Sequence, residues 1–155
     1  MNENNKTDVE ISIECLDMYM AIHSTFYDIV KDRLNKYGLS EVTPTIIYYV
    51  YKLGQNPHMM SITEFSQKSM LVTKNMTYAL GILERNGYLQ SEIHSIDRRT
   101  RLIGLTDKGT TLFNAINVVL NDLLTQTDYD SASMEKKHEA LTKELEMLKR
   151  YYINI

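Results

Sequence analysis

Apolar residues recur every three or four positions over most of the chain, the spacing that places side chains on one face of an α-helix. The first such segment, residues 9–37, carries two apolar sets. One set is Ile11, Cys15, Met18, Ile22, Phe26, Ile29 and Val30, and the other is Ile13, Leu16, Met20 and Tyr27. A helix that is apolar on two faces needs two packing partners. Gly38 is expected to end this helix.

Three further helices are predicted in the middle of the chain, each from its N-terminal cap. Thr43-Pro44 places a capping hydroxyl before a proline in the first turn, and this helix runs to Gly54. The segment 61–64, Ser-Ile-Thr-Glu, matches a capping box and begins a short helix to about Ser69. Thr73 is expected to cap the next helix, which ends at Asn86-Gly87. The last two helices are separated by about three residues and form a helix-turn-helix candidate.

The remaining pattern predicts a hairpin and two long helices. Residues 88–93 and 101–105 are strand-like and flank the polar tip 94–100. A helix follows from Thr106-Asp107, with Leu112, Ile116, Val119, Leu120, Leu123 and Leu124 as its apolar positions. The last helix follows Asp130-Ser131, and its apolar spacing alternates by four and three at Met134, His138, Leu141, Leu145, Leu148 and Tyr152. This heptad pattern is typical of a helix that packs lengthwise against a partner helix. The predicted order is ααααββαα, mainly α with a small β hairpin.

Composition narrows the class of protein without naming a function. The chain has 155 residues, of which 43% are apolar, and this suits one domain over residues 1–155. A single Cys excludes a disulfide framework. The polar, acidic N-terminus does not match a signal peptide, and no apolar stretch approaches the ~18 residues of a membrane span. We expect a cytoplasmic protein.

The charge distribution says more than the net charge of −3. Residues 1–30 hold six acidic residues and one basic residue, whereas residues 68–109 hold seven basic residues and four acidic ones. Screening limits the reach of a charge to about 10 Å at ordinary salt concentrations. The basic middle of the chain can therefore attract phosphate while the ends stay acidic.

Three motifs stand in order along this basic middle. They are Leu-Glu-Arg-Asn-Gly-Tyr-Leu at 83–89, Asp-Arg-Arg at 97–99 and Leu-Thr-Asp-Lys-Gly at 105–109. Together they resemble the MarR family of bacterial transcriptional regulators, whose pattern is roughly L-E-x-x-G-L-I, then D-x-R, then L-T-x-x-G. The resemblance covers about residues 9–153. It implies a winged helix-turn-helix lobe at about 43–105 and a homodimer formed through the helices at about 9–37 and 106–153.

In such a lobe the second helix of the motif enters the major groove and presents its N-terminal residues to the bases. Those residues are Thr73, Lys74, Asn75, Thr77 and Tyr78. Asn75 suits a bidentate contact with adenine, and Lys74 suits guanine or phosphate. The alternative for Lys74, Asn75 and Thr77 is a merely solvated helix face. Tyr78 stands where many family members carry Arg, so the family's base preference is not carried over.

The first helix of the motif and the wing, which is the hairpin of residues 88–105, complete the expected DNA contacts. The residues available to phosphate oxygens are Ser61, Gln67, Lys68 and Ser69. Arg98, Arg99 and Arg101 concentrate positive charge at the hairpin, which suits a narrow minor groove. The resemblance implies that Asp97 pairs with Arg99 or Arg101 and fixes the wing.

Two further sets of residues are candidates for ligand binding and for redox sensing. In the family, small aromatic effectors bind beside the DNA lobe, and the matching wall here is Tyr19, His23, Tyr27, Thr43 and Tyr48, for which ordinary packing is the alternative. Some members sense peroxides through one Cys near the start of the first helix. Cys15 is in that place, but Thr43 stands where those sensors tend to have a supporting Tyr, and a core role is the alternative.

No phosphate loop, nucleophile elbow or pair of catalytic carboxylates is present in the sequence, so we expect neither an enzyme nor a cofactor. The four His residues are scattered, and we expect no metal site. The expected function is a homodimeric regulator that binds double-stranded DNA at a pseudo-palindromic operator, as a repressor released by a small aromatic ligand. Two alternatives are a thiol sensor that uses Cys15 and a dimeric protein-interaction module that does not bind DNA.

Overall fold

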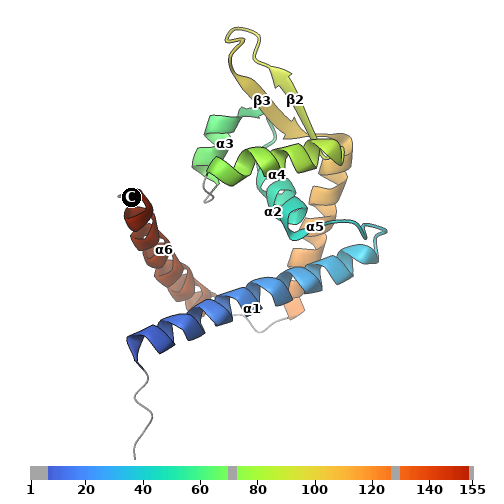
Figure 1. Cartoon of the computed structure of the whole chain (residues 1–155). Coiled ribbons are helices and arrows are strands. Elements are labelled where there is room, and N and C mark those ends of the chain that lie inside the picture. Colours follow the sequence, from blue (N-terminus) through green and yellow to red (C-terminus); the bar gives the residue numbers. More distant parts are fainter. Residues whose placement is uncertain (1–6, 70–72, 127–129, 154–155) are drawn as a thin grey trace, which may run out of the picture. The chain divides into compact units, whose positions relative to one another are not determined.

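The computed structural model describes residues 7–69, 73–126 and 130–153, with the side chains of residues 8, 73–75, 148, 149 and 151–153 left outside the description. The elements in chain order are α1 (Asp8–Asn35), α2 (Pro44–Gly54), β1 (Met60–Ser61), α3 (Ile62–Lys68), α4 (Thr73–Arg85), β2 (Leu89–Ile93), β3 (Arg101–Leu105), α5 (Asp107–Gln126) and α6 (Ser131–Ile153) (Figure 1). All eight predicted elements are present. The prediction missed β1, because two residues are too few to give a periodic pattern.

The helix boundaries follow from local hydrogen bonds. Thr7 and Glu10 form a capping box, which the sequence analysis missed: Thr7 Oγ1 accepts the Glu10 N–H, and Glu10 Oε2 accepts the Thr7 N–H at 2.8 Å. At the other end Gly38 has a φ of 74°, a conformation that suits glycine. The Leu39 N–H then reaches back to the carbonyl of Leu34. The α1 helix therefore ends two residues earlier than predicted, at Asn35.

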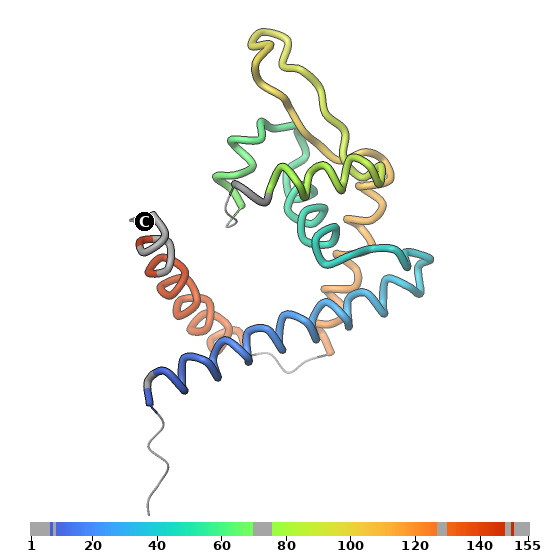
Figure 2. The backbone as a smooth tube through the Cα atoms, viewed as in Figure 1, coloured from blue at the N-terminus to red at the C-terminus, as the bar shows by residue number. Residues whose placement is uncertain are grey.

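The three strands form one antiparallel sheet in the order β1-β3-β2. Leu89 pairs with Leu105 and Ile93 with Arg101, which confirms the predicted hairpin, and Met60 of β1 pairs with Ile103 on the other edge of β3. The tube in Figure 2 shows the hairpin leaving the helices, with its loop, residues 94–100, at the far end. The sheet therefore joins the start of α3 to the base of the hairpin.

The chain divides into two compact units, one up to Leu120 and the other from Asn121 onward. The core of the first unit draws on almost every element in it. Its largest fully buried side chains are Phe65, Leu34, Ile46, Met76, Leu83, Ile103, Leu112, Ile116, Val30, Val42, Val50 and Val119. The second unit contains the end of α5 and the whole of α6. In α6 the predicted heptad positions Met134 and Leu141 are 40% and 41% exposed, and Leu148 and Tyr152 fall on side chains outside the description.

Most of α1 lies outside the core. Val30 and Leu34, near its C-terminal end, are fully buried. The exposed large apolar residues of this helix are Val9, Ile11, Ile13, Leu16, Met18, Tyr19, Met20, Ile22, Phe26 and Ile29. The prediction that this helix needs a second packing partner agrees with this exposure.

The end of α4 is fixed to the start of α5. The Thr106 hydroxyl donates to the carbonyl of Gly87 at 2.6 Å and accepts the Gly109 N–H at 3.0 Å. A Cβ atom on Gly109 would overlap the carbonyl oxygen of Tyr88, so only glycine allows the two segments to approach this closely. The L-T-x-x-G motif therefore has a structural reason in this chain: it holds the end of α4 in place.

Two helical glycines give a matched test of this packing. Gly109→Ala should lower the free energy of unfolding by about 1–3 kcal/mol, because the backbone must move to admit the methyl group. Gly81→Ala in α4 should raise it by up to about 1 kcal/mol, because a Cβ there meets no atom within 4 Å and alanine favours the helix. Urea denaturation of both variants measures the difference. Equal effects of the two substitutions would contradict the assigned contact.

Candidate nucleic-acid interface

The α4 helix has one buried face and one open face. Met76, Ala79, Leu80 and Leu83 are buried at helical spacing. On the opposite side Thr77 is exposed and Tyr78 is 71% exposed. The side chains of Thr73, Lys74 and Asn75, which the sequence analysis assigns to base contacts, lie outside the described residues. Of the five predicted base-contacting residues, the structure thus places Thr77 and Tyr78 on the open face.

The α3 helix is anchored by Phe65, which is 1% exposed, and its N-terminus is capped by Ser61. Ser61 Oγ accepts the Glu64 N–H at 3.1 Å, as predicted. The second half of the predicted capping box is wrong, because the Glu64 carboxylate binds Lys68 Nζ at 2.8 Å. Lys68 also donates to Asn56 Oδ1 at 3.1 Å, yet its side chain remains half exposed.

Ser69 does not fit its predicted role as a phosphate contact. The residue is 6% exposed, and its hydroxyl donates to the carbonyl of Ser66 at 3.3 Å. Ser69 is the C-cap of α3, where its backbone N–H donates to the carbonyl of the buried Phe65. Ser61 and Lys68 are the remaining described candidates from the predicted phosphate-contacting set on this helix, together with the exposed Gln67.

The base of the hairpin is tied to α4 by a charged cluster. Arg101 Nη2 lies 2.7 and 2.9 Å from the two carboxylate oxygens of Glu84 and 2.7 Å from Ser91 Oγ. Ser91 Oγ in turn lies 3.0 Å from Glu84 Oε1. Hydrogen bonds from Arg101, and after it from Ser91, hold the pKa of the Glu84 carboxyl below its ordinary value of about 4.5. One helix and both strands of the hairpin therefore meet at a single carboxylate.

The tip of the hairpin is closed by its own side chains. His94 Nδ1 accepts the N–H groups of Ile96 and Asp97 at 3.3 and 3.1 Å. Asp97 accepts the Arg99 N–H at 3.1 Å and the Thr100 hydroxyl at 2.6 Å. The hydrogen bond from Thr100, followed by that from the Arg99 backbone, lowers the pKa of the Asp97 carboxyl. These bonds fix the backbone of the loop.

The predicted pairing of Asp97 with an arginine side chain is wrong. Within the part of the chain that the structure describes, Asp97 contacts Arg99 only through the backbone N–H, and the Arg101 guanidinium is bound to Glu84. Arg98 and Arg99 are exposed and form no ion pair with any described residue. Within the described chain, the wing thus has two unpaired cations at its tip, and a third at its base that is bound to Glu84.

Sequence reasoning missed Glu84, Ser91 and His94 as residues that shape the wing. Glu84 is part of the L-E motif, and this is the one signal that pointed to it. Ser91 and His94 give no such signal, because their roles depend on where β2 lies relative to α4 and on how the loop closes. We therefore assign these three residues from the structure alone.

Of the five residues predicted for a ligand pocket, His23, Tyr27 and Tyr48 lie close to one another. Tyr27 and Tyr48 are half-buried, and burial raises the pKa of each, with the proximity of Tyr48 adding to the effect on Tyr27. The ring centroids of His23 and Tyr27 are 4.7 Å apart. Thr43 is used as the N-cap of α2, where its hydroxyl accepts the Ile46 N–H, and Tyr19 is 40% exposed. These five residues remain predicted ligand contacts.

The other candidate chemistry concerns thiols, metals and membranes. Cys15 is exposed on α1. Among the described residues no group of three His, Cys, Asp or Glu side chains lies close enough together to bind a metal ion. No helix in the described part of the chain is both long enough and apolar enough to span a bilayer.

The Glu84–Arg101 contact has a pH dependence whose direction follows from the lowered pKa. Its stabilising effect should be fully present above about pH 4.5 and should be lost as the pH falls through the lower pKa of the folded state. Glu84→Gln should lower the free energy of unfolding by about 0.5–1 kcal/mol at pH 7, a modest value because the pair is partly exposed. The difference between wild type and variant should shrink as the pH falls through this lowered pKa and vanish once the carboxyl is protonated in both the folded and the unfolded state.

Glu92→Gln on β2 is the matched control, since Glu92 is exposed and its carboxylate has no hydrogen-bond or ion-pair partner among the described residues. This variant should match the wild type at every pH in the same denaturation series. A loss of free energy of unfolding in the Glu84→Gln variant that does not change with pH would show that the carboxylate charge does not stabilise the wing.

Comparison with known proteins agrees with this geometry. No profile of a known protein family matches the chain. The chain is 25% identical over 146 residues to the HTH-type transcriptional regulator MhqR of Bacillus subtilis, and the match covers 94% of both proteins. Among solved structures, Streptococcus pneumoniae FabT in complex with DNA superposes with a TM-score of 0.64 at 17% identity, covering 90% of this chain and 99% of FabT.

A second solved structure is Staphylococcus aureus MarR in complex with salicylate and kanamycin, with a TM-score of 0.63 at 16% identity, covering 91% of this chain and 94% of that one. Of these proteins, MhqR is named a transcriptional regulator, and FabT is seen bound to DNA. The chain has the winged-helix fold of the MarR family of transcriptional regulators, and the resemblance that its motifs indicate is confirmed.

Proposed function

We propose that the chain binds double-stranded DNA through α4 and the tip of the hairpin and regulates transcription as a homodimer. The observation that carries the proposal is the wing tip, where a loop fixed by its own hydrogen bonds leaves Arg98 and Arg99 exposed and unpaired among the described residues. Unpaired guanidinium groups on a fixed loop suit the negative potential of a narrow minor groove. The complex of FabT with DNA supports the same use of this fold.

The α4 helix is the proposed reader of the major groove. The proposed base-contacting residues are Thr77 and Tyr78 on its open face, together with Thr73, Lys74 and Asn75, whose side chains lie outside the described residues. The buried face holds the helix against the core, so the open face is free to meet base edges. Ser61 and Lys68 on α3 would contact the phosphate backbone.

The proposed dimer uses the two apolar surfaces that one chain leaves exposed. Ten large apolar residues on α1 are exposed, and the described heptad positions of α6 include Met134 and Leu141, which are also exposed. Apolar surface of this extent is typical of a protein-protein contact. A two-fold axis would set two copies of α4 about 34 Å apart, which matches successive major grooves of a pseudo-palindromic operator.

As a repressor, such a dimer would release its operator when a small aromatic ligand favours a different spacing of the two lobes. Tyr27 and Tyr48 are the proposed centre of that ligand contact, supported by their partly buried hydroxyl groups. A coupling of about 1–3 kcal/mol between ligand and DNA would change operator affinity about 5- to 150-fold.

Replacing Arg98 and Arg99 with alanine tests the wing. The double variant should weaken binding to both operator and random DNA. The slope of log K against log salt should fall in magnitude by about 3.6 for a bound dimer, because four arginines are lost and each cationic contact contributes about 0.9. Fluorescence anisotropy at several salt concentrations, on fragments selected from genomic DNA, measures both quantities. Lys136→Ala with Lys137→Ala on α6 removes the same charge from another element and should leave the slope unchanged.

An unchanged slope in the Arg98 and Arg99 variant would remove the wing from the interface. No retained DNA at 100 mM salt, together with a co-purifying protein, would instead favour the alternative of a dimeric interaction module.

Leu16→Glu tests the dimer. Leu16 is 59% exposed in the middle of α1, and a carboxylate there would be buried without a partner in the proposed interface. The variant should sediment as a monomer at concentrations where the wild type is a dimer. Ile93→Glu is the matched control, because Ile93 is 68% exposed on β2 and should not affect association. A dimeric Leu16→Glu variant would exclude this face of α1 from the interface.

A further inference from the structure

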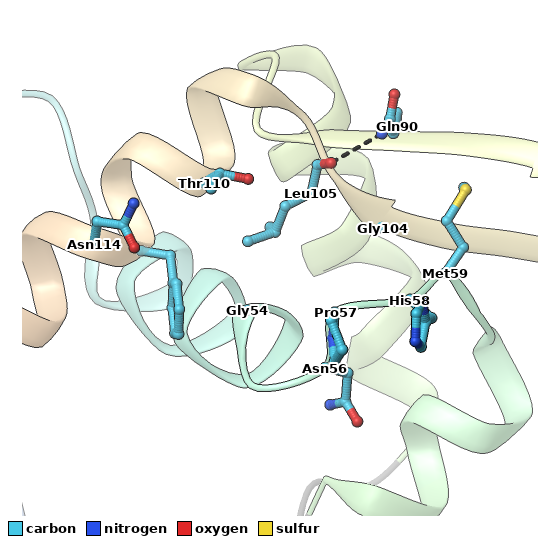
Figure 3. Close-up of a pocket in the computed structure, with 11 residues that line it drawn as sticks. Gly54, Asn56, Pro57, His58, Met59, Gln90, Gly104, Leu105, Thr110 and Asn114 are labelled. Atoms are coloured by element: carbon cyan, nitrogen blue, oxygen red, sulfur yellow. Dashed lines mark hydrogen bonds between the residues drawn. The ribbon is translucent and has the colours of Figure 1, made fainter.

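A cavity of about 300 Å³ lies within the first unit, between the end of α2, the turn at 55–59, the sheet and the first half of α5. In Figure 3 Pro57 and His58 border it from the turn, and Thr110 and Asn114 border it from α5. Its volume is at the lower end of the range for small-molecule sites. None of the residues predicted for a ligand pocket lines this cavity, so it is a separate site.

Two glycines set the shape of the cavity. A Cβ on Gly54 would overlap the ring of Phe113, so the glycine lets that ring lie against the end of α2. The same ring lies 6.2 Å from the ring of Tyr51, which holds it from another side. On the sheet, a Cβ on Gly104 would come 2.9 Å from Met59 Cγ. Phe113 and Met59 are therefore fixed as two apolar walls.

The polar side chains of the cavity are the amides of Asn56, Gln90 and Asn114, the hydroxyl of Thr110 and the imidazole of His58. Asp, Glu, Lys and Arg are absent from its described lining. The Asn114 amide has no hydrogen-bond partner among the described residues, so its donor and its acceptor are both available. Gln90 uses its amide nitrogen to donate to the carbonyl of Leu105 at 2.9 Å, and this leaves its oxygen unused (Figure 3). No carboxylate, ammonium or guanidinium group in this described lining would balance the charge of an ionic ligand, and this favours a neutral one.

We infer that this cavity binds an uncharged, flat aromatic molecule that carries an amide-like edge. The ring would pack between Phe113, Pro57 and Met59, and the edge would both donate to and accept from the Asn114 amide. Leu105 and Gln90 belong to the wing strands, so the ligand would touch the element that bears Arg98 and Arg99. The inference concerns ligand binding alone and does not depend on the proposed DNA contact.

The test uses 2-quinolinone, a neutral bicyclic lactam, and its charged analogue quinoline-2-carboxylate. Isothermal titration of the full chain should give saturable binding of 2-quinolinone at one site per chain, with a dissociation constant of about 0.1–1 mM. The carboxylate should bind at least about tenfold more weakly. Asn114→Ala should weaken 2-quinolinone binding about tenfold, and Thr110→Phe, which fills the cavity, should abolish it.

Asn121→Ala, at an exposed asparagine on α5 outside the cavity, is the control and should bind like the wild type. Thermal melts establish that each variant is folded, and the exposed position of Asn114 keeps that variant decisive if Thr110→Phe does not fold. The inference is overturned by the absence of saturable binding, by equal binding of the two probes, or by an Asn114→Ala variant that binds as the wild type does.

Discussion

The two-sidedness of α4 is the constraint on which the rest of the structure depends. Met76 and Leu83 are fully buried on one face of the helix, and Thr77 and Tyr78 lie on its exposed side. The packing of the core therefore fixes which side of the helix meets solvent. Thr106 and Gly109 fix the end of the same helix against α5. A helix held in this way can present side chains to a rigid duplex without losing further conformational freedom on binding.

The wing is positioned by the same helix. Glu84 lies near the end of α4 and receives Arg101 from β3, so the place of the hairpin depends on where α4 lies. The arginines of the hairpin have different roles, and this explains how a chain with a net negative charge can be suited to bind DNA. Arg101 is used for structure, while Arg98 and Arg99 stay unpaired among the described residues at a tip that His94 and Asp97 hold closed. Local placement of charge, and not the net charge of −3, decides the electrostatics of the surface.

Features that depend on a few neighbouring residues were predictable from the sequence. The cap at Thr43, the helix end at Gly87 and the hairpin of residues 88–93 and 101–105 all follow from local chemistry, and the structure agrees. Contacts between distant segments were not predictable. The family resemblance implied that Asp97 pairs with Arg99 or Arg101, whereas the fold brings Arg101 to Glu84, seventeen residues away in the sequence. The burial of Ser69 and the cavity beside Asn114 depend on tertiary packing in the same way.

Hydrogen-deuterium exchange, with and without the DNA that the purified protein retains from genomic fragments, tests the central claim most directly. If α4 and the wing tip form the interface, bound DNA should slow exchange in peptides that cover residues 73–79 and 94–100, and it should leave the exposed middle of α6 unchanged. Slower exchange confined to other segments, with both of these regions unaffected, would contradict the account.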